Sequence, residues 1–137
     1  MLEIKDNALT AEIYNNLHRD ADFIIYEDSD VEKALAADIY DVVIFKDNDA
    51  IACGRVIGDT RIVFFIKDVI VRSDFRKQGY GKMIVEKLLE YIRSKACPQA
   101  YVGLMSTPGK EKFYEKFGFI RRPNADHGSG MVMFIEK

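Results

Sequence analysis

A seven-residue segment at residues 76–82 carries the clearest chemical pattern in the sequence. It precedes a predicted helix, and the first N–H groups of a helix have no partners within it. Two glycines let the backbone turn sharply and approach a ligand closely, while one arginine and two lysines add positive charge. The segment comprises Arg76, Lys77, Gln78, Gly79, Tyr80, Gly81 and Lys82. This combination predicts a binding site for a phosphate or a pyrophosphate.

The second candidate is Tyr114, which lies within the aromatic run at residues 113–119. A phenol has an ordinary pKa of about 10 and therefore carries its proton at neutral pH. Tyr114 can thus act as a general acid toward a departing thiolate or alkoxide. Phe113 and Phe117 are spaced so that both fall on one face of a short helix, which favours core packing.

Several other kinds of site are disfavoured. The sequence has neither the Gly-x-x-x-x-Gly-Lys-Ser/Thr pattern nor a complete Gly-x-Gly-x-x-Gly after an early strand, which argues against an NTPase and a dinucleotide dehydrogenase. Its two histidines and two scattered cysteines form no metal-ligand pattern, so no metal is expected. The low cysteine content fits a reducing, cytoplasmic setting.

The length and the charge of the chain limit the kinds of partner that it can bind. The 137 residues suit a single domain spanning residues 1–137, and no apolar run approaches the ~18–20 residues needed to cross a membrane. Residues 1–50 hold 13 acidic and 4 basic side chains, a net charge of −9, which favours a cation. Residues 51–137 hold 9 acidic and 16 basic ones, a net charge of +7, which favours an anion. The overall charge of −2, without a dense basic run, argues against a nucleic-acid partner.

Hydrophobic spacing predicts the elements of the first half of the chain. Thr10 caps an expected helix over residues 11–19, and a second helix opens at residues 28–30. Strands are expected at residues 42–45 and 51–57, joined by a hairpin turn.

A central strand is expected within residues 61–71, and Lys67-Asp68 interrupts it where a bulge or kink fits. Simple alternation places four side chains on one of its faces: Ile62, Phe64, Ile66 and Ile70.

The second half opens with the strongest helix signal, an apolar stripe over residues 80–95, followed by a strand at residues 101–105. A short helix should then be capped by Thr107 and ended by Gly118. Residues 119–121 and 131–135 are expected to finish the sheet as an antiparallel pair.

Strand, helix and strand in that order imply a right-handed parallel crossover. The predicted fold class is therefore α+β: a mixed, mostly antiparallel sheet with a central β-α-β parallel crossover and flanking helices.

Two motifs in this order resemble the signatures of the GCN5-related N-acetyltransferase (GNAT) superfamily. They are Arg76-x-x-Gly79-x-Gly81 and Phe113-Tyr114-x-x-Phe117-Gly118-Phe119, and the order of elements agrees over almost the whole chain. The resemblance implies the α/β-type GNAT fold, acetyl-CoA as cosubstrate, and acetyl transfer to a primary amine of a small molecule by direct attack in a ternary complex.

The resemblance also implies residue roles. The segment from Arg76 to Lys82 would bind the pyrophosphate of acetyl-CoA, and the strand residues Val69, Ile70 and Val71 would hold its pantetheine arm and thioester. Tyr114 would protonate the leaving thiolate, with Lys112 and Phe113 beside the cofactor. Asp68 is the nearest carboxylate that could take the proton of the amine, directly or through water.

Alternatives remain open at this point. One alternative is that the acceptor is a peptide or protein amine. The other is that the chain is a non-catalytic sensor or regulatory module that binds coenzyme A. A tyrosine at position 114 favours catalysis over the module. A homodimer is also left open.

Overall fold

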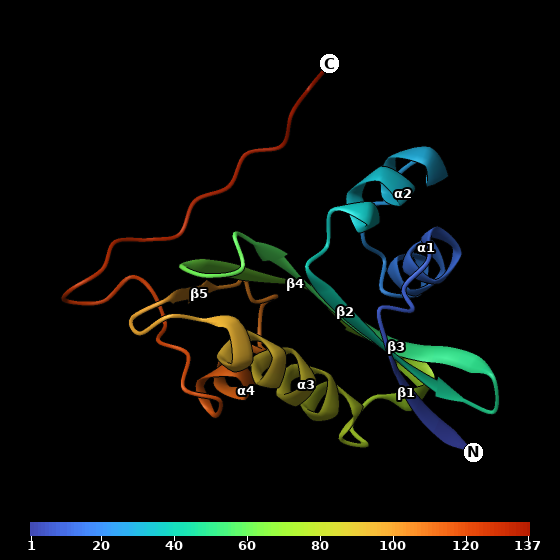
Figure 1. The fold of residues 1–137 in the computed structure, drawn as a ribbon. Coiled ribbons are helices and arrows are strands. Elements are labelled where there is room, and N and C mark those ends of the chain that lie inside the picture. The colour runs from blue at the N-terminus through green and yellow to red at the C-terminus, as the bar shows by residue number, and fades with distance from the viewer. The chain divides into compact units, whose positions relative to one another are not determined.

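The computed structural model describes all residues from 1 to 137, and they divide into two compact units. The first unit, Met1–Gly103, contains the whole sheet and three of the four α-helices (Figure 1). Its elements are β1 (Leu2–Asp6), α1 (Ala11–Asp20), α2 (Asp28–Ala36), β2 (Tyr40–Lys46), β3 (Asp49–Gly58), β4 (Val63–Val71), the 3₁₀ turn η1 (Ser73–Phe75), α3 (Tyr80–Lys95) and β5 (Tyr101–Gly103). The helix over residues 80–95 therefore has the predicted bounds.

The five strands form one sheet in the order β1-β2-β3-β4-β5. The first three pairings are antiparallel, whereas β4 and β5 are parallel and joined by α3. The predicted α+β class and its central crossover are confirmed. Strand β1 was not predicted, because all five of its residues are exposed and leave no buried alternation to detect.

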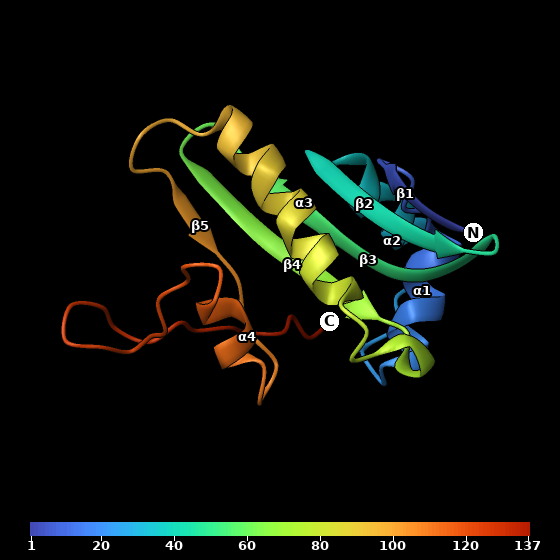
Figure 2. The same ribbon diagram turned by 90° about the horizontal axis from the view of Figure 1, so that it is seen from below.

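Helix α3 covers one face of the sheet and crosses β2, β3 and β4 (Figure 2). Its apolar stripe is buried, as expected from the spacing of Ile84, Val85, Leu88, Leu89 and Ile92. Gly54 on β3 is what permits the close approach, because a Cβ there would lie 2.6 Å from Cγ2 of Ile84. Larger residues at this position would push the helix off the sheet.

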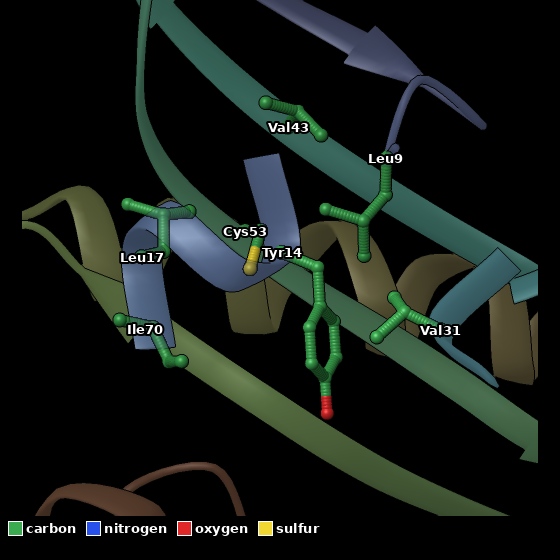
Figure 3. Close-up of a cluster of buried hydrophobic side chains, with 7 residues drawn as sticks. All are labelled: Leu9, Tyr14, Leu17, Val31, Val43, Cys53 and Ile70. Atoms are coloured by element: carbon green, nitrogen blue, oxygen red, sulfur yellow. The ribbon is translucent and has the colours of Figure 1, made fainter. Parts of the chain in front are cut away.

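The opposite face carries α1 and a compact apolar cluster. Figure 3 shows Tyr14 and Leu17 of α1 packed toward Cys53 on β3 and Ile70 on β4. The full cluster consists of Leu9, Tyr14, Leu17, Val31, Val43, Cys53 and Ile70, each at most 8% exposed. This cluster fixes α1 against the part of β4 that matters for the site.

Local signals account for the turns and the first helix. The N–H of Ile13 donates to Oγ1 of Thr10 at 3.2 Å, so the predicted cap is confirmed. Asp47 and Asn48 have φ of 50° and 72°, the left-handed pair that a two-residue hairpin requires. Asp59 closes the next turn by accepting three backbone N–H groups through Oδ1.

A β-bulge interrupts β4 at the predicted place. Arg55 pairs with Lys67 and Cys53 pairs with Ile70, so one residue of β3 faces two residues of β4. Asp68 takes up the extra residue at φ 57°. The bulge reverses the alternation, and the expectation that Ile70 shares a face with Phe64 and Ile66 is therefore wrong. Ile70 instead packs in the cluster under α1.

The second unit, Leu104–Lys137, contains α4 (Glu111–Glu115) as its one helix. Thr107 does not cap it, because Gly109 at φ 87° breaks the chain direction and the helix starts after Lys110. Gly118, at φ 97°, follows the last turn as expected.

The predicted pair of strands at residues 119–121 and 131–135 is not formed, and β5 ends at Gly103 rather than at residue 105. Between the two segments, Oδ1 of Asn124 accepts the N–H groups of Asp126 and His127, which fixes a local turn in place of a strand ladder. The apolar side chains of residues 131–135 are exposed. None of the helices in the chain is both long and apolar enough to span a lipid bilayer.

Candidate functional site

The loop at residues 76–82 leaves its backbone amides open. Lys77 and Gly79 have φ of 63° and 90°, and Gly79 is the N-cap of α3. The first helical bond runs from the N–H of Met83 to the carbonyl of Gly79, and no side chain caps the helix. Residues 80–82 therefore present N–H groups to a ligand, with the positive end of the helix dipole behind them.

The space in front of this loop is free. A Cβ built on Gly79 would meet no heavy atom within 4 Å. Arg76, Lys77 and Lys82 are exposed around it, and Lys82 lies 4.0 Å from Glu86 one turn further along α3. The arrangement offers amides and exposed cations together, which is what a diphosphate requires.

The neighbouring stretch of β4 has an open backbone edge. Strand β5 pairs with β4 only from Val63 to Phe65, so residues 66–71 have no strand on that side. In Figure 2, β4 continues beyond the end of β5. An extended ligand could add to this edge as a strand does, through alternate N–H and C=O groups. Val69, Ile70 and Val71 belong to this stretch, and the side chain of Ile70 is buried.

Asp68 lies within the open stretch, and its side chain is buried. Its Oδ1 accepts a hydrogen bond from Nε2 of His18 at 2.9 Å, and its Oδ2 accepts one from Nε of Arg55 at 2.7 Å. Arg55 also donates from Nη1 to Oδ1 of Asp38 at 2.7 Å. Sequence reasoning missed His18 and Asp38. The one available signal was Arg55 within the apolar strand at residues 51–57, because a charge buried there needs a partner.

The two carboxylates that accept hydrogen bonds from Arg55 have pKa values shifted in opposite directions. Burial alone would raise the pKa of Asp68, but the hydrogen bonds from His18 and Arg55 and the nearby charge of Lys67 outweigh it and lower the pKa to about 2. For Asp38 burial prevails over the bond to Arg55 and raises the pKa to about 6. The two pKa values differ because the two carboxylates have different surroundings. Asp38 has the Asp41 charge nearby, and its Oδ2 is buried without any hydrogen bond.

The remaining predicted residues lie on α4, in the second unit. Burial raises the pKa of Tyr114 above its ordinary value, so the phenol keeps its proton at neutral pH. Its ring packs edge-on against those of Phe113 and Phe119, with centroids 5.0 Å and 6.0 Å away. Lys112 is exposed. The structure thus joins residues 68–71 and 76–82 within the first unit, while Lys112, Phe113 and Tyr114 belong to the second.

Comparison with known proteins agrees with this geometry. The model of the acetyltransferase (GNAT) family matches residues 8–119. The chain belongs to this family.

A crystal structure from meticillin-resistant Staphylococcus aureus, of a protein of unknown function named as a probable acetyltransferase, is similar over the whole chain. It has a TM-score of 0.88 and 30% sequence identity, covering 98% of this chain and 100% of that one. A structure of AAC(6')-Iy in complex with a coenzyme A bisubstrate analogue has a TM-score of 0.68 and 18% identity, covering 100% of this chain and 98% of that one, and shows the shared fold.

The glucosamine 6-phosphate N-acetyltransferase of Trypanosoma brucei brucei is 36% identical over 78 residues, 48% of this chain and 52% of that protein. The chain thus spans about half the length of this relative, and it spans 27% to 42% of the length of other curated relatives.

Proposed function

We propose that this protein is an acetyl-CoA-dependent N-acetyltransferase that acetylates the primary amine of a small molecule by direct attack in a ternary complex. One observation carries the proposal: the open amide loop before α3 directly adjoins the unpaired, bulged edge of β4. Arg76 links the two, because its Nε donates to the carbonyl of Val71 at 3.2 Å. A diphosphate and an extended thioester arm need those two surfaces side by side.

The residues present fit coenzyme A. The open amides of residues 80–82 and the cations Arg76, Lys77 and Lys82 suit its diphosphate, and the free space at Gly79 is where a side chain would obstruct it. Val69, Ile70 and Val71 would pair with the pantetheine arm. When bound, acetyl-CoA supplies the thioester carbonyl that the amine attacks and the thiolate that leaves.

Groups on this chain can assist the steps of acetyl transfer. A backbone N–H near Ile70 would donate a hydrogen bond to the carbonyl oxygen as negative charge develops on it. A C–N bond forms, the C–S bond breaks, and Tyr114 would donate its proton to the thiolate. Asp68 is a poor acceptor for the proton of the amine, because its pKa is about 2 and both of its oxygens already accept hydrogen bonds. We therefore propose that water accepts the proton of the amine.

The acceptor is proposed from charge and from relatives. Residues 1–50 carry 13 acidic against 4 basic side chains, which attracts a cationic amine before its deprotonation. The names of two similar proteins, the glucosamine 6-phosphate enzyme and the coenzyme A–acetylneamine complex, point to small amines as the class to test first. We place the reaction in the cytoplasm, where the free thiols Cys53 and Cys97 would remain reduced.

The decisive experiment measures thiol release from acetyl-CoA with amino sugars, aminoglycosides, polyamines and peptide amines, alongside calorimetry of coenzyme A binding. Turnover with a small amine supports the proposal. Turnover only with peptides would change the substrate class, and binding without turnover would favour the coenzyme A-binding module. Failure to bind coenzyme A, with ATP stabilising the protein instead, would overturn it.

A further inference from the structure

Four ionisable side chains meet beneath the β4 bulge with almost no contact with solvent. They come from four places in the fold: α1, β3, β4 and the turn before β2. Their side chains are between 3% and 9% exposed. We call His18, Asp68, Arg55 and Asp38 the buried charge network.

Both ring nitrogens of His18 lie close to oxygen atoms. Its Nδ1 lies 2.7 Å from the backbone carbonyl of Tyr14, and its Nε2 lies 2.9 Å from Oδ1 of Asp68. Two contacts at opposite sides of the ring fix its orientation, so α1 reaches the Asp68 carboxylate through a side chain that is itself held in place.

Aromatic rings enclose His18 on α1. The ring of Tyr14 stacks on it with centroids 3.8 Å apart, and the edge of Phe23 lies 5.9 Å away. Asp68 is the one carboxylate in contact with it, and Lys67 reaches the same Oδ1 of Asp68 at 3.6 Å from a more exposed position.

The network holds a strained backbone in place. Asp68 has φ 57°, a conformation that costs free energy for residues other than glycine. His18 and Arg55 anchor its side chain from α1 and β3, and the thiol of Cys53 donates to its backbone carbonyl at 3.3 Å. The next three residues, Val69 to Val71, form the open edge of β4 adjoining the amide loop.

We propose that Asp68 is a positioning residue: clamped by His18 and Arg55, it fixes the bulge so that the outward-facing backbone groups of Val69 and Val71 face the reacting thioester, while Ile70 pairs with Cys53 on β3. This rests on the proposed function, and it assigns to the buried carboxylate a role other than base. The amide loop and its cations lie outside the network, so cofactor binding depends on it much less than the chemical step does.

Kinetics of substitutions at position 68 separate positioning from base catalysis. Asparagine tolerates the left-handed conformation and keeps one oxygen for Arg55 or His18, whereas alanine does neither. We expect kcat to fall roughly 10-fold in Asp68→Asn and roughly 100-fold in Asp68→Ala, with KM for acetyl-CoA changed less than about threefold. Equal and near-complete loss in both variants would overturn the positioning role, because neither side chain can take a proton from an amine.

A matched control is available at Asp22. It has φ 59°, nearly the same backbone conformation as Asp68, but it is exposed and stands outside the network. Asp22→Asn should leave both kcat and the KM for acetyl-CoA at wild-type values. A loss there comparable to that of Asp68→Asn would overturn the assignment of the effect to the buried network.

A measurement on the free protein makes the test independent of turnover. Amide hydrogen exchange at residues 69–71 should rise at least about fivefold in Asp68→Asn, while exchange within α3 stays unchanged. Unchanged exchange at residues 69–71 would overturn the proposal. If the wild type acetylates no amine, the proposed function fails, whereas the hydrogen-exchange measurement still decides whether Asp68 holds the bulge.

Discussion

Arg76 donates a hydrogen bond from Nε to the backbone carbonyl of Val71, 3.2 Å away, and so ties the loop before α3 to the end of β4. The amide loop and the open edge of β4 come from different elements, and this hydrogen bond holds them at a fixed spacing. The spacing between a bound diphosphate and a bound thioester is then a property of the fold, and changes on either surface should have separable effects.

Gly79→Ala should weaken coenzyme A binding by roughly 10-fold or more. Gly79 has φ 90°, which strains any residue with a Cβ, and the added carbon would enter the free space where the ligand approaches. Titration calorimetry with coenzyme A checks this. Gly128→Ala is the matched control, because no heavy atom lies within 4 Å of a Cβ there either, and its affinity should match that of the wild type. Equal affinity in Gly79→Ala would show that the diphosphate binds elsewhere.

Tyr114→Phe should lower kcat by roughly 100-fold while leaving the Kd of coenzyme A unchanged, since it removes only the donated proton. Because burial raises the pKa of Tyr114 above its ordinary value, wild-type kcat should not fall through loss of this proton in the pH range where an exposed phenol titrates. Steady-state rates across pH check both statements. Tyr91→Phe, on α3 and stacked on Tyr40, is the control and should keep full activity. An active Tyr114→Phe would remove this residue from the mechanism.

Gly54→Ala should destabilise the first unit by about 1–3 kcal/mol, because its Cβ would lie 2.6 Å from Ile84 Cγ2 and 3.0 Å from Leu88 Cδ1. Urea unfolding measures the change. A double variant with Ile84→Ala should be less destabilised than the sum of the two single variants, since alanine lacks the Cγ2 that the new Cβ would meet. No loss in the single variant would mean that α3 shifts without cost.

Asp68 should contribute about 2 kcal/mol of stability that is lost in acid. Burial would raise its pKa, but the bonds from His18 and Arg55 lower it from 3.8 to about 2, so the folded state binds this proton less readily than the unfolded chain. The contribution is complete above pH 4 and disappears as the pH falls through 2. Denaturant unfolding between pH 2 and pH 5 should show this slope in the wild type and a flatter one in Asp68→Asn.

Asp38 should make the folding stability depend on pH in the opposite direction, and over a different pH range. Burial raises its pKa from 3.8 to about 6, so the folded state retains a proton that the unfolded chain has released. Stability should therefore fall by about 2 kcal/mol as the pH rises from 4 to 6. Asp38→Asn should remove this fall, and an identical slope in the variant would contradict the raised pKa.

Local signals were enough to predict much of the fold. The stripe of α3, the cap at Thr10, the Asp47-Asn48 turn and the bulge at Asp68 all depend on residues close in sequence. The errors arise where contacts between residues far apart in the sequence determine the local structure. Ile70 changed face because the bulge adds a residue to β4, and β1 was missed because pairing with β2, rather than burial, makes it a strand.

The candidate site shows the same division. The amide loop could be recognised from its glycines and basic residues, because the geometry is local. The partners of Asp68 could not, since His18 lies 50 residues away in sequence and meets it only when α1 packs on the sheet. Asp38 and Arg55 are likewise 17 residues apart.

The short ladder between β4 and β5 has one further consequence. A strand edge that admits a ligand arm is equally open to a strand from another molecule, and such edges promote self-association. Lys67, whose side chain is 51% exposed, places a full charge in this stretch and opposes that kind of stacking. This lysine thereby gives colloidal protection to the edge that the thioester would occupy.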